Sequence, residues 1–277
     1  MIRGALSLAG RLRVTLGYGV LLVAVTAILV ALGPDVRDDV IAHASTNLHN
    51  LRRGHVGTLL GSAFVVDAGS IAIWLPGLLC LLAVAELVWG SARLLIAFVA
   101  GHVGATLLVA AGLVAAVRGG WASADIARAT DVGMSYRATA VLGALTAAIP
   151  TRLRPPWMAW WLGVAVSSVA VAQDFTGVGH ALALLLGMAV AARFGAGGRW
   201  TGWRVGLLSV GCWFGFLVLA NTVPEMAVAV ATGALAAAVA GLTAMALRHR
   251  SSATRTNEKV SRSMGFDDTP ANHRVRQ

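Results

Sequence analysis

The chain has 277 residues, of which 57% are hydrophobic and only 12% are charged, and its formal net charge is +10. One soluble core of this size cannot bury so much apolar surface, so the composition excludes a soluble globular domain and predicts an integral membrane protein. The 22 Lys and Arg residues lie between and after apolar runs and are not gathered on one basic domain, which is evidence against a nucleic-acid-binding protein.

Eight apolar runs are long enough to cross a hydrocarbon core of about 30 Å, which requires roughly 20 helical residues. They cover approximately residues 14–33, 71–89, 94–117, 133–149, 157–173, 177–194, 204–222 and 225–247. The first run has no small-residue cleavage site before Pro34, so we interpret it as an uncleaved anchor. A shorter apolar segment, 55–66, lies in a long first loop, 34–70, and suits a re-entrant or interfacial piece.

The loop charges predict how these spans are oriented. If the N-terminus is cytoplasmic, 16 of the 22 basic residues fall on the inner side, as the positive-inside rule requires. We therefore expect a multi-pass protein of the plasma (inner) membrane with both termini in the cytoplasm. Arg outnumbers Lys 21 to 1, which fits a bacterial source with a GC-rich genome. The polar stretch 248–277 predicts a disordered, basic cytoplasmic tail.

Polar side chains are scarce inside the spans, and each is a functional candidate because placing it in lipid is costly. Ser135 begins the fourth span and His180 begins the sixth, each a few residues past an outer loop. One return span separates them, so the fourth and sixth spans run in parallel and the two side chains sit at matched depth. An imidazole can take the proton of a serine hydroxyl and activate it as a nucleophile, which predicts a serine hydrolase dyad.

The residues around this pair resemble the rhomboid family of intramembrane serine proteases. The fourth-span motif of that family, GxSGxxxxLLGAL, is matched by Gly133, Ser135, Leu142, Gly143, Ala144 and Leu145. The sixth-span motif, AHLxGLLxG, is matched by His180, Leu185, Leu186 and Gly187. An E…G…R pattern that joins the second and third spans is met by Glu86, Gly90 and Arg93.

The resemblance covers roughly residues 14–194 and implies an all-α polytopic membrane fold. It implies a six-helix rhomboid-like core within residues 1–200, to which residues 201–247 add two C-terminal transmembrane helices. The implied activity is that of an intramembrane serine endopeptidase that cleaves single-span membrane proteins near the outer face. Ser135 would be the nucleophile and His180 the general base, and no metal or organic cofactor is implied.

Departures from the family pattern leave other hypotheses open. Tyr136 replaces the glycine that follows the nucleophile and Arg137 comes next, which predicts a narrower site. The second-span HxxxN side chains that help to hold the oxyanion are absent, with Ser70 and Trp74 near those positions, and the first-loop Trp-Arg pair is missing. One alternative is a catalytically inactive rhomboid-like protein that binds transmembrane clients. The other is a small-solute transporter, which the lack of an internal repeat disfavours.

Other polar residues of the spans are expected to be structural. His102, in the middle of the third span, is interpreted as a packing residue that is hydrogen-bonded to a neighbouring helix. Glu86 and Arg93 lie at the inner end of a tight turn and are expected to pin the second and third spans together. Arg137 is expected either to reach outward to the surface or to pair with Asp131.

Overall fold

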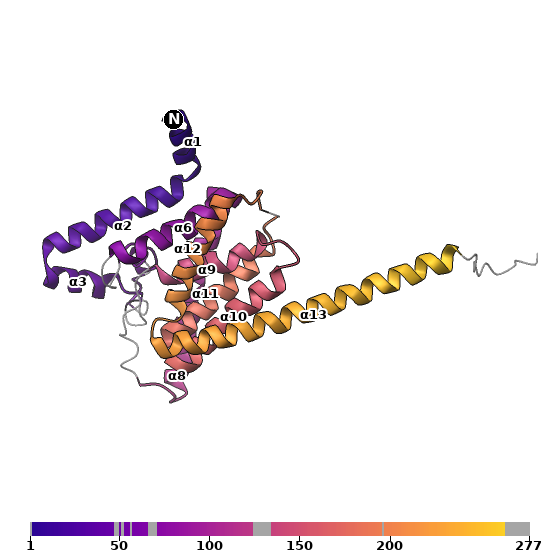
Figure 1. The fold of residues 1–277 in the computed structure, drawn as a ribbon. Coiled ribbons are helices and arrows are strands. Elements are labelled where there is room, and N and C mark those ends of the chain that lie inside the picture. Colours follow the sequence, from indigo (N-terminus) through magenta and orange to yellow (C-terminus); the bar gives the residue numbers. More distant parts are fainter. Residues whose placement is uncertain are drawn as a thin grey trace, which may run out of the picture.

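The structure, a computed structural model, describes residues 2–46, 50, 53–55, 57–65, 71–123, 134–195 and 197–263. Within these residues all regular structure is helical (Figure 1). The predicted spans correspond to α2 (Arg13–Leu32), α6 (Ile71–Trp89), α7 (Ser91–Val99) with η1 (Ala100–Gly104) and α8 (Ala105–Arg118), α9 (Ser135–Ala144) with η3 (Leu145–Ala147), α10 (Arg154–Ala172), α11 (Phe175–Ala191), α12 (Gly202–Leu219) and α13 (Val223–Ser263). Short helices α1 (Ile2–Arg11), α3 (Pro34–Ala44) and α5 (Thr58–Gly61) flank the first span.

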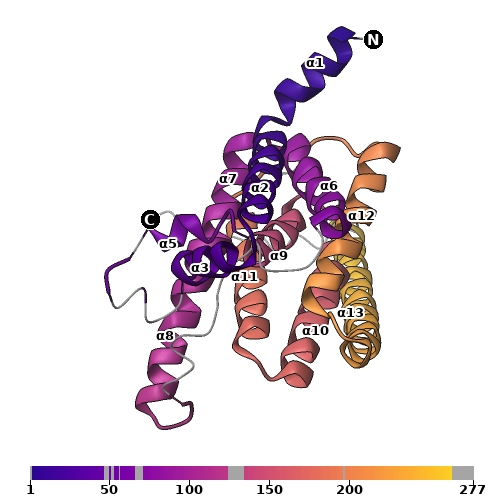
Figure 2. The same ribbon diagram turned by 90° about the vertical axis from the view of Figure 1, so that its left-hand side faces the viewer.

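The helices differ in length according to where they lie in the bundle. Six segments of the described chain are long and apolar enough to cross a membrane, namely α2, α6, α7 to α8, α10, α12 and the first part of α13. Helix α11 has 17 residues and α9 has only 10. Every residue of α9 from Tyr136 to Ala144 is buried, and Figure 2 shows this helix at the centre of the bundle. Because protein surrounds it, α9 need not match the thickness of the lipid.

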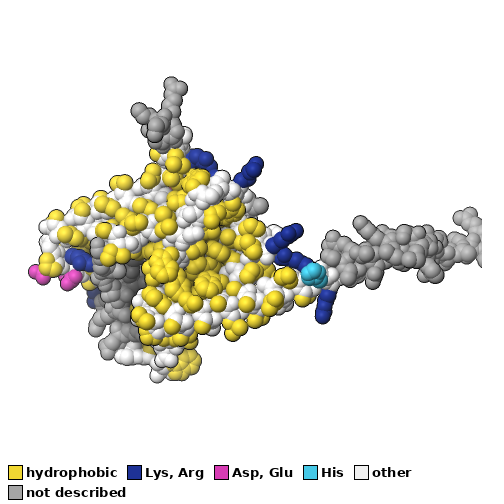
Figure 3. Space-filling model, in the orientation of Figure 1, with side chains coloured by type: hydrophobic (Ala, Val, Ile, Leu, Met, Phe, Trp, Pro, Cys, Tyr) yellow, Lys and Arg dark blue, Asp and Glu magenta, His cyan; other side chains and the backbone are white. Residues whose placement is uncertain are grey.

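The outside of the bundle is largely apolar, as a lipid-facing surface should be. Large exposed side chains include Val20, Ile73, Val166, Trp213 and Leu242. In Figure 3 acidic side chains appear at the end where α3 lies, and most Lys and Arg side chains lie toward the opposite end. A surface of this kind is unfavourable in water and favourable in a bilayer, so the chain is a multi-pass, all-α membrane protein.

The two C-terminal helices are packed onto the bundle. Helix α12 lies against α6, where a Cβ added to Gly211 would be 2.9 Å from the Cα of Leu81. Helix α13 lies against α10, where a Cβ added to Gly163 would be 3.1 Å from the Cα of Gly233. Such short distances require glycine, because backbones can approach this closely only without a side chain. Helix α12 therefore covers α6, and α13 covers α10.

The last helix continues past the predicted span. Helix α13 runs on to Ser263 and extends beyond the bundle (Figure 1), whereas the sequence predicted a disordered tail from residue 248. Residues 248–263 contain neither Gly nor Pro, so nothing in the sequence breaks the helix there. Residues 264–277 lie outside the described part of the chain, and for them the tail stays a prediction.

Candidate functional site

The two predicted dyad residues lie on neighbouring helices at the centre of the bundle. Ser135 is the first residue of α9, and His180 lies in the second turn of α11. Tyr136, near the start of α9, lies beside Gly179, and Gly143, near its end, lies beside Leu184 and Met188. The two helices are therefore parallel, as the sequence predicted, and each begins near its candidate catalytic residue.

Glycines bring α9 and α11 close to each other. A Cβ added to Gly143 would lie 3.1 Å from the carbonyl carbon of Leu184. A Cβ added to Gly187 would lie 2.8 Å from the carbonyl carbon of Ala140, and ordinary contacts of this type are 3.4–4 Å. A larger residue at either position would push the helices apart, so these glycines set the separation of the two halves of the site.

The imidazole of His180 is buried beside Tyr136. The two rings meet edge to face, with centroids 5.4 Å apart and an interplanar angle of 81°. The Nε2 atom of His180 is buried and forms no hydrogen bond with any described residue. Ser135 is partly exposed, and in the described residues its hydroxyl makes no hydrogen bond to His180. Catalytic hydrogen bonds of this kind are often long in a substrate-free enzyme and tighten only in the complex.

The structure separates the roles of the bulky pair Tyr136 and Arg137. Tyr136 occupies the space beside Gly179, where an added Cβ would lie 2.6 Å from its Cε1 atom. Arg137, one residue further along α9, instead extends toward the first loop and the ring of Phe98. Tyr136 is therefore the member of the pair whose ring lies against His180, and the narrowing of the site stays a prediction.

Arg137 is a fully buried cation that holds the first loop against the bundle. Its guanidinium group donates hydrogen bonds to the carbonyl oxygens of Ala63 and Ser62. The same group lies 5.1 Å from the ring centre of Phe98 and 5.7 Å from that of Tyr18. Backbone carbonyls and aromatic faces thus replace water around the charge. Arg137 therefore does not reach the surface, and Asp131, its other predicted partner, lies outside the described residues.

A serine and a histidine outside the candidate dyad are hydrogen-bonded to each other where the first loop meets η1. Ser62 Oγ and His102 Nε2 are 3.2 Å apart, and the Thr46 hydroxyl lies 2.9 Å from Ser62 Oγ. His102 sits in η1, a π-helical turn that widens the helix at this point. Ser62 is 0% exposed and His102 is 5% exposed, so no substrate carbonyl can reach this pair. His102 is hydrogen-bonded as expected, but its partner belongs to the loop and not to a neighbouring helix.

Glu86 fastens the first span to the second. Its carboxylate accepts hydrogen bonds from the backbone N–H groups of Val14 and Thr15, at 3.0 and 2.8 Å, in the first turn of α2. It also accepts from the hydroxyls of Thr15 and Ser91, each at 2.7 Å. A carboxylate at a helix N-terminus satisfies N–H groups that have no partner within the helix. Because Ser91 is the first residue of α7, Glu86 also joins the second span to the third, as expected. Arg93 has a different contact from the one expected, since it lies over the ring of Phe194 at 5.9 Å.

The N-termini of α9 and α11 shape the electrostatics around the dyad. The first N–H groups of a helix have no intrahelical acceptor, so the backbone N–H of Ser135 is a candidate donor to an oxyanion. Asp174 caps α11 by accepting a hydrogen bond from the Gly177 N–H at 2.6 Å, so a carboxylate lies at the N-terminus of the helix that carries His180. Sequence reasoning missed Asp174, although a capping residue six positions before His180 is visible in the sequence. Gly133 and Ser70 lie outside the described residues.

The fold and the placement of Ser135 and His180 define a helical membrane protein with a candidate serine–histidine site on two parallel, glycine-packed helices. A family model described as "Rhomboid-like protein" matches residues 13–198, about two-thirds of the chain. The chain therefore belongs to the rhomboid-like family. The match ends before α12, so the two C-terminal helices lie outside it. No curated protein and no solved structure matches the chain.

Proposed function

We propose that this protein is an intramembrane serine protease in which Ser135 and His180 form the catalytic dyad. The observation that carries the proposal is the pairing of α9 and α11, which run in parallel in glycine-mediated contact and carry Ser135 and His180 near their N-terminal ends. The buried Nε2 of His180, which no described residue occupies, supports the same assignment because a general base needs a free nitrogen.

In the proposed reaction, Ser135 Oγ attacks a peptide carbonyl while His180 takes its proton. His180 then gives that proton to the amine of the leaving segment, and an acyl-enzyme forms on Ser135. Water, deprotonated by His180, attacks the ester and releases the new carboxyl end, and the proton returns to Ser135. The Ser135 N–H at the start of α9 is the donor proposed for the oxyanion.

The proposed substrates are single-span membrane proteins. Ser135 lies at the end of a short buried helix, so a substrate helix must present an unwound segment there for its carbonyl to be reached. The loop charges assign this end of the bundle to the outer face. Cleavage is therefore proposed near the outer side of the membrane.

A non-catalytic function is the second candidate. The edge-to-face contact between Tyr136 and His180, together with the missing hydrogen bond from Ser135 among the described residues, favours a site that binds transmembrane clients without cutting them. In that case the close contact between α9 and α11 through their glycines stabilises the fold and does not serve catalysis.

Labelling with a fluorophosphonate probe distinguishes the two. We expect the detergent-purified protein to be labelled, and Ser135→Ala and His180→Ala to lose both the label and the cleavage of a transmembrane reporter. Ser209→Ala is the matched control, because its hydroxyl on α12 only bonds the carbonyl of Val205 in its own helix. Labelling or cleavage that survives in Ser135→Ala would refute the protease, and binding of the reporter without cleavage would establish the second candidate.

A further inference from the structure

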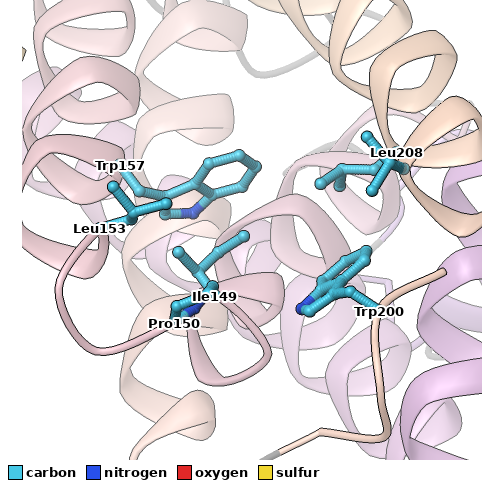
Figure 4. Close-up of a pocket in the computed structure, with 7 residues that line it drawn as sticks. Ile149, Pro150, Leu153, Trp157, Trp200 and Leu208 are labelled. Carbon is cyan, nitrogen blue, oxygen red and sulfur yellow. The ribbon is translucent and has the colours of Figure 1, made fainter. Parts of the chain in front are cut away.

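A cavity of about 440 Å³ lies at the end of the bundle opposite Ser135, away from the candidate dyad. It is bounded by the turn after η3, the start of α10 and the segment leading into α12. Figure 4 shows the rings of two tryptophans and the side chains around them converging on this space, which include Ile149, Pro150, Leu153, Trp157, Trp200 and Leu208. This volume falls within the range of about 300–1,000 Å³ that is typical of sites for small molecules.

Every residue that lines the cavity is apolar, which makes hydrocarbon a better occupant than water. The two tryptophan rings of this wall carry indole N–H groups. The indole N–H of Trp200 donates to the carbonyl oxygen of Ala148 at 2.9 Å. The indole N–H of Trp157 is buried and has no acceptor among the described residues. Neither N–H is exposed to the cavity, so its wall offers an occupant apolar contacts alone.

The surroundings of the cavity are cationic. Arg152 and Arg199 are exposed in the two segments that border it. Arg154 is engaged with the carbonyl oxygens of Ile149 and Ala147, at 2.9 and 2.7 Å, and so holds the turn in place. The sequence has no acidic residue between Asp174 and Glu225, and none between Asp131 and Asp174. An anionic group near Arg152 and Arg199 therefore meets no competing carboxylate from these segments.

We infer that the cavity binds one acyl chain of an anionic glycerophospholipid. The apolar wall holds the hydrocarbon, and the exposed Arg152 and Arg199 attract the anionic headgroup. A neutral lipid offers the same chain and ester but lacks the charge. The inference does not depend on proteolytic activity, because the cavity lies at the opposite end of α9 from Ser135.

The first test uses the unmodified chain in vesicles. Phosphatidylglycerol and phosphatidylcholine, each with a photoreactive diazirine at the end of an acyl chain, are cross-linked to the protein, and the labelled peptides are sequenced. We expect phosphatidylglycerol to label the peptides containing residues 149–157 and 200–208 more strongly than phosphatidylcholine does. Equal labelling by both lipids, or labelling confined to other lipid-facing helices, would overturn the inference.

The second test uses variants, with bound lipid counted by native mass spectrometry. Leu208→Trp fills the cavity and should remove the bound phosphatidylglycerol. Leu235→Trp is the matched control, because the same substitution on the exposed face of α13 leaves the cavity open. Arg152→Gln with Arg199→Gln should reduce the preference for phosphatidylglycerol by roughly fivefold per arginine. Undiminished phosphatidylglycerol in a folded Leu208→Trp protein, or detergent adducts alone in the parent, would contradict the proposed site.

Discussion

Replacing Gly187 with alanine tests whether the contact between α9 and α11 builds the site. The new Cβ would lie 2.8 Å from the carbonyl carbon of Ala140, whereas an ordinary contact is at least 3.4 Å. The atom it meets is backbone, which cannot rotate away, so the helices must separate by at least about 0.6 Å. Overpacking of this kind typically costs about 1–3 kcal/mol of folding free energy.

The same displacement should impair the proposed reaction. Moving reacting groups by about 1 Å costs roughly 100-fold in rate, so a separation of about 0.6 Å or more should slow cleavage at least tenfold. The assays are thermal unfolding in detergent and the initial rate of cleavage of a transmembrane reporter in vesicles. Gly112→Ala on α8 is the control, because a Cβ at that position has nothing within 4 Å.

The two readouts separate errors in the fold from errors in the function. If Gly187→Ala unfolds at the temperature of the parent and of Gly112→Ala, the close approach of the two helices is refuted. If it is less stable but the parent shows no Ser135-dependent cleavage, the packing stands and the protease does not. If it is less stable yet cleaves at the full rate, the spacing of α9 and α11 does not position the dyad.

Three further predictions concern other parts of the bundle. Arg137→Lys keeps the charge but loses the planar guanidinium group that donates to two carbonyl oxygens, so the free energy of unfolding in detergent should fall by about 2–3 kcal/mol. An unchanged value would contradict the role of Arg137 in holding the first loop. Glu86→Gln should cost a similar amount because its amide N–H would face other donors, while Arg93→Gln should change little; equal losses would indicate an ion pair between them. Cysteines at positions 123 and 251, replacing Ser123 and Ser251, should react with an impermeant thiol reagent from opposite sides, and labelling of both from one side would refute the topology.

Much of the architecture follows from composition and periodic apolar runs. Each predicted span corresponds to a helix because a lipid-exposed backbone must satisfy its own hydrogen bonds, and a helix does so within one segment. The parallel course of α9 and α11 follows from counting one return span between Ser135 and His180. Both deductions use only local sequence and the thickness of the bilayer, so neither requires knowledge of which helices touch.

The partners of the buried polar residues could not be deduced in this way. Glu86 and Arg93 are seven residues apart and looked like a pair, yet the carboxylate binds the start of α2, more than 70 residues earlier in the chain. Arg137 contacts the first loop across a comparable separation. Hydropathy and charge patterns indicate whether a residue lies within the membrane. They carry no information about which distant backbone group will contact its side chain.

The sequence by itself therefore determined that the chain is a multi-pass, all-α membrane protein, and it singled out Ser135 and His180 as the candidate dyad. Only the tertiary structure decided that Tyr136 and not Arg137 contacts His180, that α9 is short and wholly buried, and that α12 covers α6 and α13 covers α10. The physical reason is that helix formation in lipid is local, whereas close packing depends on which glycine meets which backbone. Gly143, Gly179 and Gly187 look alike in the sequence, and their partners exist only once α9 and α11 have come together.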